Sequence, residues 1–233
     1  MITLYAAQGT ANMGDFLNCL PVLSGIYDSY GKIDLIIQND MKKFNGFRDL
    51  LSYQQMFNSV KYESELTRET KCFPFNSWVD DFSFDGVNPI ETSRYAKILK
   101  SSYNLNFDID SNFELEIPDL NIGERDIVVG DRCFNTTSDK RRSCDVIQSS
   151  GKFNGVEYLD YTNSCIYNAN IIKQCNKFIT TFTGVAILAD LMDVPFDIYY
   201  TKDFDGWENQ SIEFAYKKHL YFNRKSTLKL LDD

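Results

Sequence analysis

The chain has 233 residues, of which 43% are hydrophobic and 24% are charged, a globular composition sufficient for one large or two ordinary domains. A formal net charge of −9 argues against nonspecific electrostatic binding to nucleic acid or to an anionic membrane. The only histidine, His219, lies in a polar C-terminal stretch, which argues against most of the usual catalytic arrangements, including Ser-His-Asp, Cys-His and histidine-rich zinc sites. We therefore expect any chemistry to depend on carboxylates, amides, lysines, arginines and backbone dipoles.

The first thirty residues predict a strand, a glycine-containing turn and a helix. Residues 2–6 form a short apolar run that is typical of a buried strand. Residues 8–14 are rich in glycine and small side chains, and residues 15–30 repeat apolar side chains at spacings of three and four, which predicts a helix. Pro21 lies inside this helix and lacks an N–H for Leu17, so we expect a bend. A unit of this kind holds ligands at the carboxyl end of its strand.

Asp15 stands directly after Gly14, in the first turn of the predicted helix. The helix dipole favours an ionised carboxylate at this place, and the geometry of such a unit points it toward the crevice. The alternative interpretation is that Asp15 only caps the helix.

The remainder of the first half completes a Rossmann-like unit. The sequence predicts a strand at 33–38, a short helix over 46–53, a possible strand at 60–62, a loop-rich segment at 63–93 and a helix at 95–103. A polar passage ending near Pro118 is the best candidate linker. We therefore expect an N-terminal domain of residues 1–121.

A second Rossmann-like unit is predicted in residues 122–233. Strands are expected at 126–129, 156–159, 178–182 and 196–200, with the end of one helix at 171–177 and another helix at 185–192. The two units predict an α/β protein of two Rossmann-like domains that face a cleft.

The sequence has two candidate corners, by which we mean places where a strand runs into a small-residue turn and then a helix. The first contains Gly14 and Asp15, and the second contains Thr183 and Gly184. The first N–H groups of a helix have no intrahelical partner, so a phosphate group binds well there. Cationic charge would come from the neighbouring run Lys140, Arg141 and Arg142. The alternatives are a plain helix cap and a solvated basic run.

Two motifs resemble the heptosyltransferase family. Residues 12–23 contain a Gly-Asp pair followed by Leu-Pro-x-Leu, which is similar to the N-terminal signature of that family. Residues 183–189, followed by Asp193-Val-Pro195, are similar to its donor-site strand, turn and helix. The resemblance implies a GT-B architecture, in which two Rossmann-like domains hold a nucleotide-sugar donor between them.

The resemblance also implies roles for individual residues. Asp15 matches the family aspartate that deprotonates the acceptor hydroxyl, and Thr183 and Gly184 match the turn that holds the donor diphosphate. The predicted donor-binding residues are completed by Gly14, Lys140 and Arg141.

The sequence departs from the family pattern at two positions. Phe182 stands where the family has an aspartate before the Ser/Thr-Gly pair, and Ile187 stands where it has a histidine. The donor sugar is therefore expected to be contacted differently, or to be a different sugar.

The expected reaction is an inverting, metal-independent glycosyl transfer from a nucleotide diphosphate sugar, with Asp15 as base and with no cofactor beyond this co-substrate. The acceptor is a saccharide or a modified base of phage DNA; DNA would require a basic stripe drawn from Lys217, Lys218, Arg224, Lys225 and Lys229. One alternative is a non-catalytic nucleotide or nucleotide-sugar binding module. Another is a divalent metal held by one of two D-x-D motifs, Asp108 with Asp110 or Asp203 with Asp205.

The sequence also predicts a cytoplasmic location without integral membrane association. No apolar run is long enough to span a bilayer, and no signal peptide is recognisable at the N-terminus. Six scattered cysteines without a C-x-x-C pair suggest reduced thiols: Cys19, Cys72, Cys133, Cys144, Cys165 and Cys175.

Overall fold

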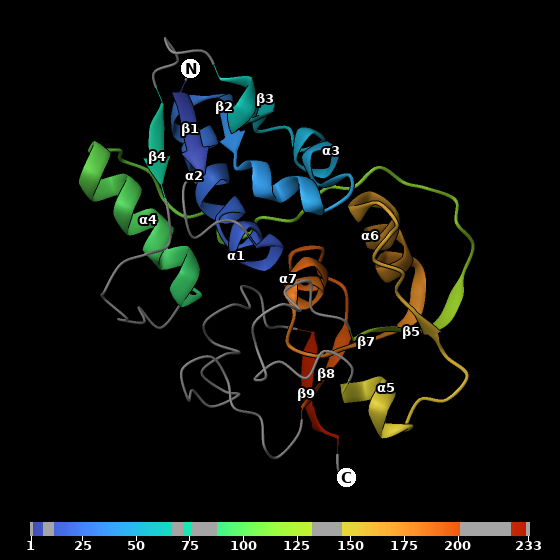
Figure 1. Ribbon diagram of the computed structural model, residues 1–233. Coiled ribbons are helices and arrows are strands. Elements are labelled where there is room, and N and C mark those ends of the chain that lie inside the picture. Colours follow the sequence, from blue (N-terminus) through green and yellow to red (C-terminus); the bar gives the residue numbers. More distant parts are fainter. Residues whose placement is uncertain are drawn as a thin grey trace.

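The computed structural model describes residues 2–6, 12–66, 72–75, 88–131, 146–200 and 225–231. Its strands form two sheets, one in each half of the chain, with helices packed around them (Figure 1). The first sheet has the order β3-β2-β1-β4 and the second has the order β6-β5-β7-β8-β9. Every described strand pairing is parallel, as expected where helices connect the strands. The expected α/β architecture of two Rossmann-like units is therefore confirmed.

The first sheet contains one strand that local sequence did not reveal. Its strands are β1 (Ile2–Ala6), β2 (Ile33–Ile37), β3 (Phe57–Tyr62) and β4 (Phe73–Phe75). The edge strand β4 lies in a segment expected to be loop, and its Pro74 is tolerated because an edge strand needs fewer backbone donors. A buried contact defines it, since the Phe75 ring packs edge-on against Tyr95 at a centroid distance of 5.9 Å.

The helix expected over residues 15–30 is two helices. The helical segments of the first half are α1 (Met13–Leu17), α2 (Leu20–Tyr30), η1 (Asn39–Lys43), α3 (Phe47–Ser52), η2 (Glu63–Glu65) and α4 (Ile90–Tyr103). The helix is interrupted at Asn18 and Cys19, so Pro21 lies in the first turn of α2. A proline costs little there because the first N–H groups of a helix have no helical acceptor. The expected bend at Pro21 is thus a complete break.

The second sheet gains its last strand from far along the chain. Its elements are β5 (Arg125–Gly130), α5 (Val146–Ser150), β6 (Glu157–Tyr158), α6 (Cys165–Gln174), β7 (Cys175–Thr180), α7 (Gly184–Leu191), β8 (Phe196–Tyr200) and β9 (Ser226–Leu230). Strand β9 was not expected, and it pairs with β8 in parallel. Asp197 of β8 accepts hydrogen bonds from Thr227 and Lys229 of β9.

Residues 104–124, the connecting segment, contain no helix or strand and are tied to both halves. The Leu115 N–H donates to the Leu191 carbonyl of α7 at 2.7 Å. The Gln54 side chain of the first half bonds both to the N–H and to the carbonyl of Glu116, at 3.1 and 2.7 Å. The expected domain boundary after residue 121 falls within this segment and stays a prediction.

One continuous apolar core runs through both halves. It joins Leu4 and Phe16 of the first half to Phe178 and Leu188 of the second, all of them at most 1% exposed. Within the described ranges, no helix combines the length and the apolar character that crossing a bilayer requires.

Candidate functional site

The two predicted corners touch through their glycines. A Cβ atom added to Gly184 would lie 3.1 Å from the Gly14 nitrogen, and one added to Gly14 would lie 3.2 Å from the Gly184 Cα. The second added atom would also lie 2.9 Å from Ile187 Cδ1. Helices α1 and α7 therefore begin side by side, at a point where only glycine allows the backbones to come so close (Figure 1).

Asp15 lies one residue beyond this contact and is half-buried. Its carboxylate oxygen Oδ2 accepts a hydrogen bond from Asn12 Nδ2 at 3.2 Å. Its backbone carbonyl accepts a hydrogen bond from the Tyr95 hydroxyl at 2.9 Å. The carboxylate thus stands in the first turn of α1, where the helix dipole favours negative charge.

Thr183 is the N-cap residue of α7, and its side chain makes no capping hydrogen bond. Its Oγ1 lies 3.5 Å from Oγ1 of Thr180, whose hydroxyl donates to the Gly130 carbonyl at 2.6 Å. Gly130 ends β5 and is the register partner of Thr180 in β7. The N-terminus of α7 therefore lies at the carboxyl edge of the second sheet, beside the residues that follow β5.

A pocket of about 380 Å³ opens at this edge. It is lined by Val129, Asp131, Gln148, Tyr158, Leu159, Asp160 and Tyr161. The two Asp131 oxygens accept hydrogen bonds from the Ile147 and Gln148 N–H groups at 3.2 and 2.7 Å, so this carboxylate caps α5. The backbone N–H and the hydroxyl of Thr162 donate to Asp160, and these bonds hold the pKa of Asp160 below its usual value.

Sequence reasoning missed this pocket, although a signal was present. Asp131 and Asp160 each follow within two residues of a strand that the sequence predicts, and the carboxyl ends of parallel strands meet at one edge of a sheet. The basic run Lys140, Arg141 and Arg142 lies outside the described residues. The described lining of the pocket contains carboxylates and no cationic side chain.

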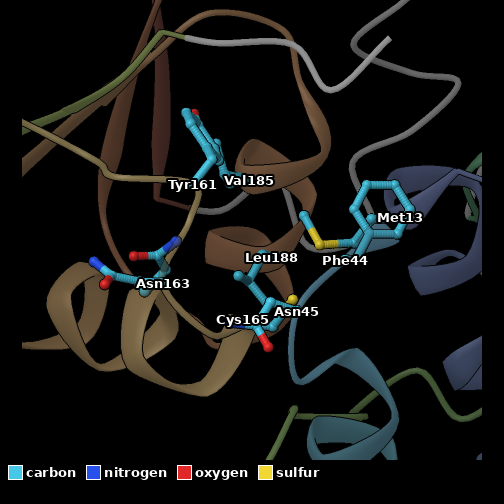
Figure 2. Close-up of a pocket in the computed structure, with 9 residues that line it drawn as sticks. Met13, Phe44, Asn45, Tyr161, Asn163, Cys165, Val185 and Leu188 are labelled. Atoms are coloured by element: carbon cyan, nitrogen blue, oxygen red, sulfur yellow. The ribbon is translucent and has the colours of Figure 1, made fainter. Parts of the chain in front are cut away.

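A second, much smaller pocket lies between the two halves (Figure 2). Its cavity volume of about 10 Å³ has room for roughly one water molecule. Met13, Phe44 and Asn45 line it from the first half, and Tyr161, Asn163, Cys165, Asn168, Val185 and Leu188 line it from the second. Asn168 Oδ1 is buried and has no hydrogen-bond partner among the described residues, so the pocket suits an ordered water and not a nucleotide.

Polar groups also gather where the strands of the first sheet end. The Tyr5 hydroxyl donates to Glu63 Oε2 at 2.6 Å, and Glu63 Oε1 accepts from the Asn39 N–H at 3.3 Å. Partial burial and the hydrogen bond to Glu63 raise the pKa of Tyr5 to about 12. Gln38 Nε2 donates to the carbonyl of Ala6, the last residue of β1, at 3.3 Å.

The structure places part of the two alternative sites. Asp110 accepts a hydrogen bond from Ser24 Oγ at 2.7 Å. In the part of the chain that the structure describes, no group of three or more His, Cys, Asp or Glu side chains is arranged so that it could hold a metal ion. Asp203 and Asp205 lie outside the described residues. Of the basic stripe considered for DNA, Lys225 and Lys229 are described, and they pair with Asp193 at 2.6 Å and Asp197 at 2.7 Å.

No protein-family model matches the sequence, and no curated protein matches it either. Solved structures do resemble the fold. Heptosyltransferase WaaC from E. coli, determined with ADP, superposes with a TM-score of 0.58 at 12% identity, over 99% of this chain and 93% of its own. A family 9 glycosyl transferase from Veillonella parvula gives 0.61 at 10% identity, over 98% and 85%. E. coli ADP-heptose LPS heptosyltransferase II gives 0.58 at 11% identity, over 98% and 90%.

These likenesses extend over nearly the whole chain and include both sheets. The expected heptosyltransferase-like fold, with the GT-B arrangement of two Rossmann-like units, is therefore confirmed.

Proposed function

We propose that this protein is a glycosyltransferase that moves a sugar from a nucleotide diphosphate donor to an acceptor hydroxyl. The observation that carries the proposal is the contact between Gly14 and Gly184, which brings the first turn of α1, with Asp15, against the N-terminus of α7. One corner supplies a carboxylate and the other supplies a site for phosphate. The fold likeness to heptosyltransferases, one of them determined with ADP, supports the same function.

The donor would lie along the carboxyl edge of the second sheet. Its nucleoside fits the pocket of about 380 Å³, where tyrosine rings can stack and Asp160 can accept hydrogen bonds from sugar hydroxyls. Its diphosphate would reach the N-terminus of α7, where Thr183 and the first N–H groups donate to phosphate oxygens. We propose Lys140 and Arg141 as the cationic partners of that diphosphate.

In the reaction, the Asp15 carboxylate takes the proton of the acceptor hydroxyl. The acceptor oxygen then forms a bond to the anomeric carbon while the bond from that carbon to the diphosphate breaks, with inversion. The negative charge that develops on the leaving diphosphate is stabilised by the α7 dipole, Thr183 and the basic residues, without a metal ion.

The position where the resemblance implies a histidine is apolar and buried here. Ile187 is 4% exposed, and its Cδ1 lies against the Gly14 backbone. An isoleucine offers no hydrogen bond to a sugar hydroxyl. We therefore propose that polar recognition of the sugar comes from other residues.

The acceptor would approach from the first half, where Tyr5, Gln38 and Glu63 surround the end of β1. This polar edge suits a saccharide. The second possible acceptor is a modified base in duplex DNA. The salt dependence of acceptor binding distinguishes the two acceptors. Binding to DNA weakens steeply as salt rises, whereas binding of a neutral saccharide does not.

The proposal is tested with Asp15→Asn. We expect the rate of sugar transfer to fall by about 10² to 10⁴, since a positioned general base contributes that much. The thermal shift produced by ADP or ADP-heptose should be unchanged, because the variant removes a proton acceptor and leaves the donor site in place. The rate is measured as release of ADP from ADP-heptose and from other nucleoside diphosphate sugars.

Asp110→Asn is the matched control, because it removes a carboxylate of the connecting segment that also accepts a side-chain hydrogen bond. An Asp15→Asn enzyme with the wild-type rate would refute the base. Thermal shifts by nucleotide sugars without any release of the nucleoside diphosphate would instead identify a binding module.

A further inference from the structure

We propose that Tyr95 positions Asp15: its hydroxyl, on α4, holds the short helix that carries the carboxylate. The inference rests on the proposed role of Asp15 as base and adds a residue that touches no reacting atom. Tyr95 bonds to the backbone carbonyl of Asp15, so it acts on the placement of the carboxylate and not on its proton.

Helix α1 needs outside support because it has only 5 residues and ends in a break. At that break the Cys19 N–H donates to the Phe16 carbonyl at 2.9 Å, three residues back, and not to Asp15 four residues back. Pro21 has no N–H to offer to Leu17. The break therefore removes helical hydrogen bonds that would otherwise fix the end of α1, and contacts from outside the helix take over this role.

Helix α4 supplies two such partners. The Tyr95 hydroxyl donates to the Asp15 carbonyl, and Thr92 Oγ1 donates to the Asn18 carbonyl, each at 2.9 Å. The two donors are three residues apart, so they share one face of α4. Figure 1 shows one end of α4 beside α1, and this face of α4 bonds to α1 at Asp15 and to the C-cap residue of α1, Asn18.

Tyr95 is itself held firmly. Its side chain is 0% exposed, and its ring packs edge-on against Phe75 of β4 with an interplanar angle of 80°. The position of the hydroxyl is therefore set by the first sheet, through β4. A small displacement of a catalytic group costs much rate, because proton transfer and attack need close alignment.

The test compares two tyrosines of α4. Tyr95→Phe removes the hydroxyl and keeps the buried ring. Tyr103→Phe is the matched control, since the Tyr103 hydroxyl also donates to a backbone carbonyl, that of Pro74, at 2.6 Å. With ADP-heptose as probe, we expect Tyr95→Phe to lower kcat for ADP release by about 10- to 100-fold, with KM within about twofold of wild type. Tyr103→Phe should leave both constants within about twofold.

The double variant Asp15→Asn/Tyr95→Phe separates positioning from general damage. If Tyr95 acts through Asp15, adding Tyr95→Phe to Asp15→Asn lowers the rate no further. A further loss of 10-fold or so in that background, or an equal loss in Tyr103→Phe, would overturn the inference. So would a crystal structure of Tyr95→Phe with α1 unmoved, whichever donor the enzyme uses. Full activity of Asp15→Asn alone is a different result, because it removes the proposed base itself.

Discussion

Positions 14 and 184 require glycine for a reason that the local sequence does not reveal. Each glycine reads as part of a tight turn before a helix, and this reading located both corners. The structure adds that the two backbones lie against each other, with Ile187 packed beside them. That contact joins positions far apart along the chain, so no local pattern contains it.

We predict that Gly14→Ala destabilises the protein by about 1–3 kcal/mol, because the new methyl group overpacks the contact. The methyl would lie 2.9 Å from Ile187 Cδ1 and 3.2 Å from the Gly184 Cα. Ile187→Val removes the first of these two atoms. The double variant should therefore recover part of the stability lost in Gly14→Ala, as measured by urea unfolding. Simple additivity of the two substitutions would contradict the contact.

The elements of the fold divide into those with a local signal and those without one. Strands β1, β2 and β8 and helix α7 were predicted because apolar runs and small-residue turns mark them. Strand β4 has 3 residues, and β9 depends on pairing with β8, so both are defined by distant partners. The tie from Tyr95 to Asp15 belongs to this second kind, which is why the sequence indicated the carboxylate but not its support.

Acid should weaken the pairing of β8 with its neighbours. Partial burial alone would raise the pKa of Asp197, but hydrogen bonds from Lys229, Thr227 and Lys177 outweigh burial and lower the pKa. A carboxyl whose pKa is lowered by folding stabilises the native state above its unfolded pKa of about 3.9, and this contribution is lost as the pH falls through the folded pKa.

We therefore predict that Asp197→Asn lowers the urea midpoint at pH 7, and that this effect shrinks progressively as the pH falls below about 4. Asp193→Asn is the control, because its ion pair with Lys225 is exposed, with 42% and 45% of the two side chains accessible, and such pairs contribute little. A larger effect of Asp197→Asn at acid pH than at neutral pH would show that the sign is wrong.

At the scale of the molecule, the two halves share one core. The Cys165 N–H donates to the Asn45 carbonyl at 2.7 Å, and Asn45 Nδ2 donates to the Thr162 carbonyl at 3.1 Å. The sequence predicted two units facing each other, and it did so correctly because each unit repeats the same local pattern. It could not predict how closely they pack, since that depends on contacts between halves.

Thiol labelling tests whether the halves separate. Cys165 lines the small pocket between them, and burial raises its pKa to about 12. Cys19 is fully buried inside the first half, and burial raises its pKa as well. If the core unfolds as one unit, iodoacetamide should label both cysteines together, and only as urea unfolds the protein. Mass spectrometry that finds Cys165 labelled while Cys19 is still protected would mean that the halves part without unfolding.

The connecting segment has a practical consequence for anyone who wishes to express the halves as separate fragments. A cut within residues 104–124 would separate Leu115 from Leu191, or Gln54 from Glu116. Each fragment would then expose to water the part of the shared apolar core that the other half now covers, and such surfaces promote aggregation. Recombinant truncations and inserted tags therefore belong elsewhere on the molecule.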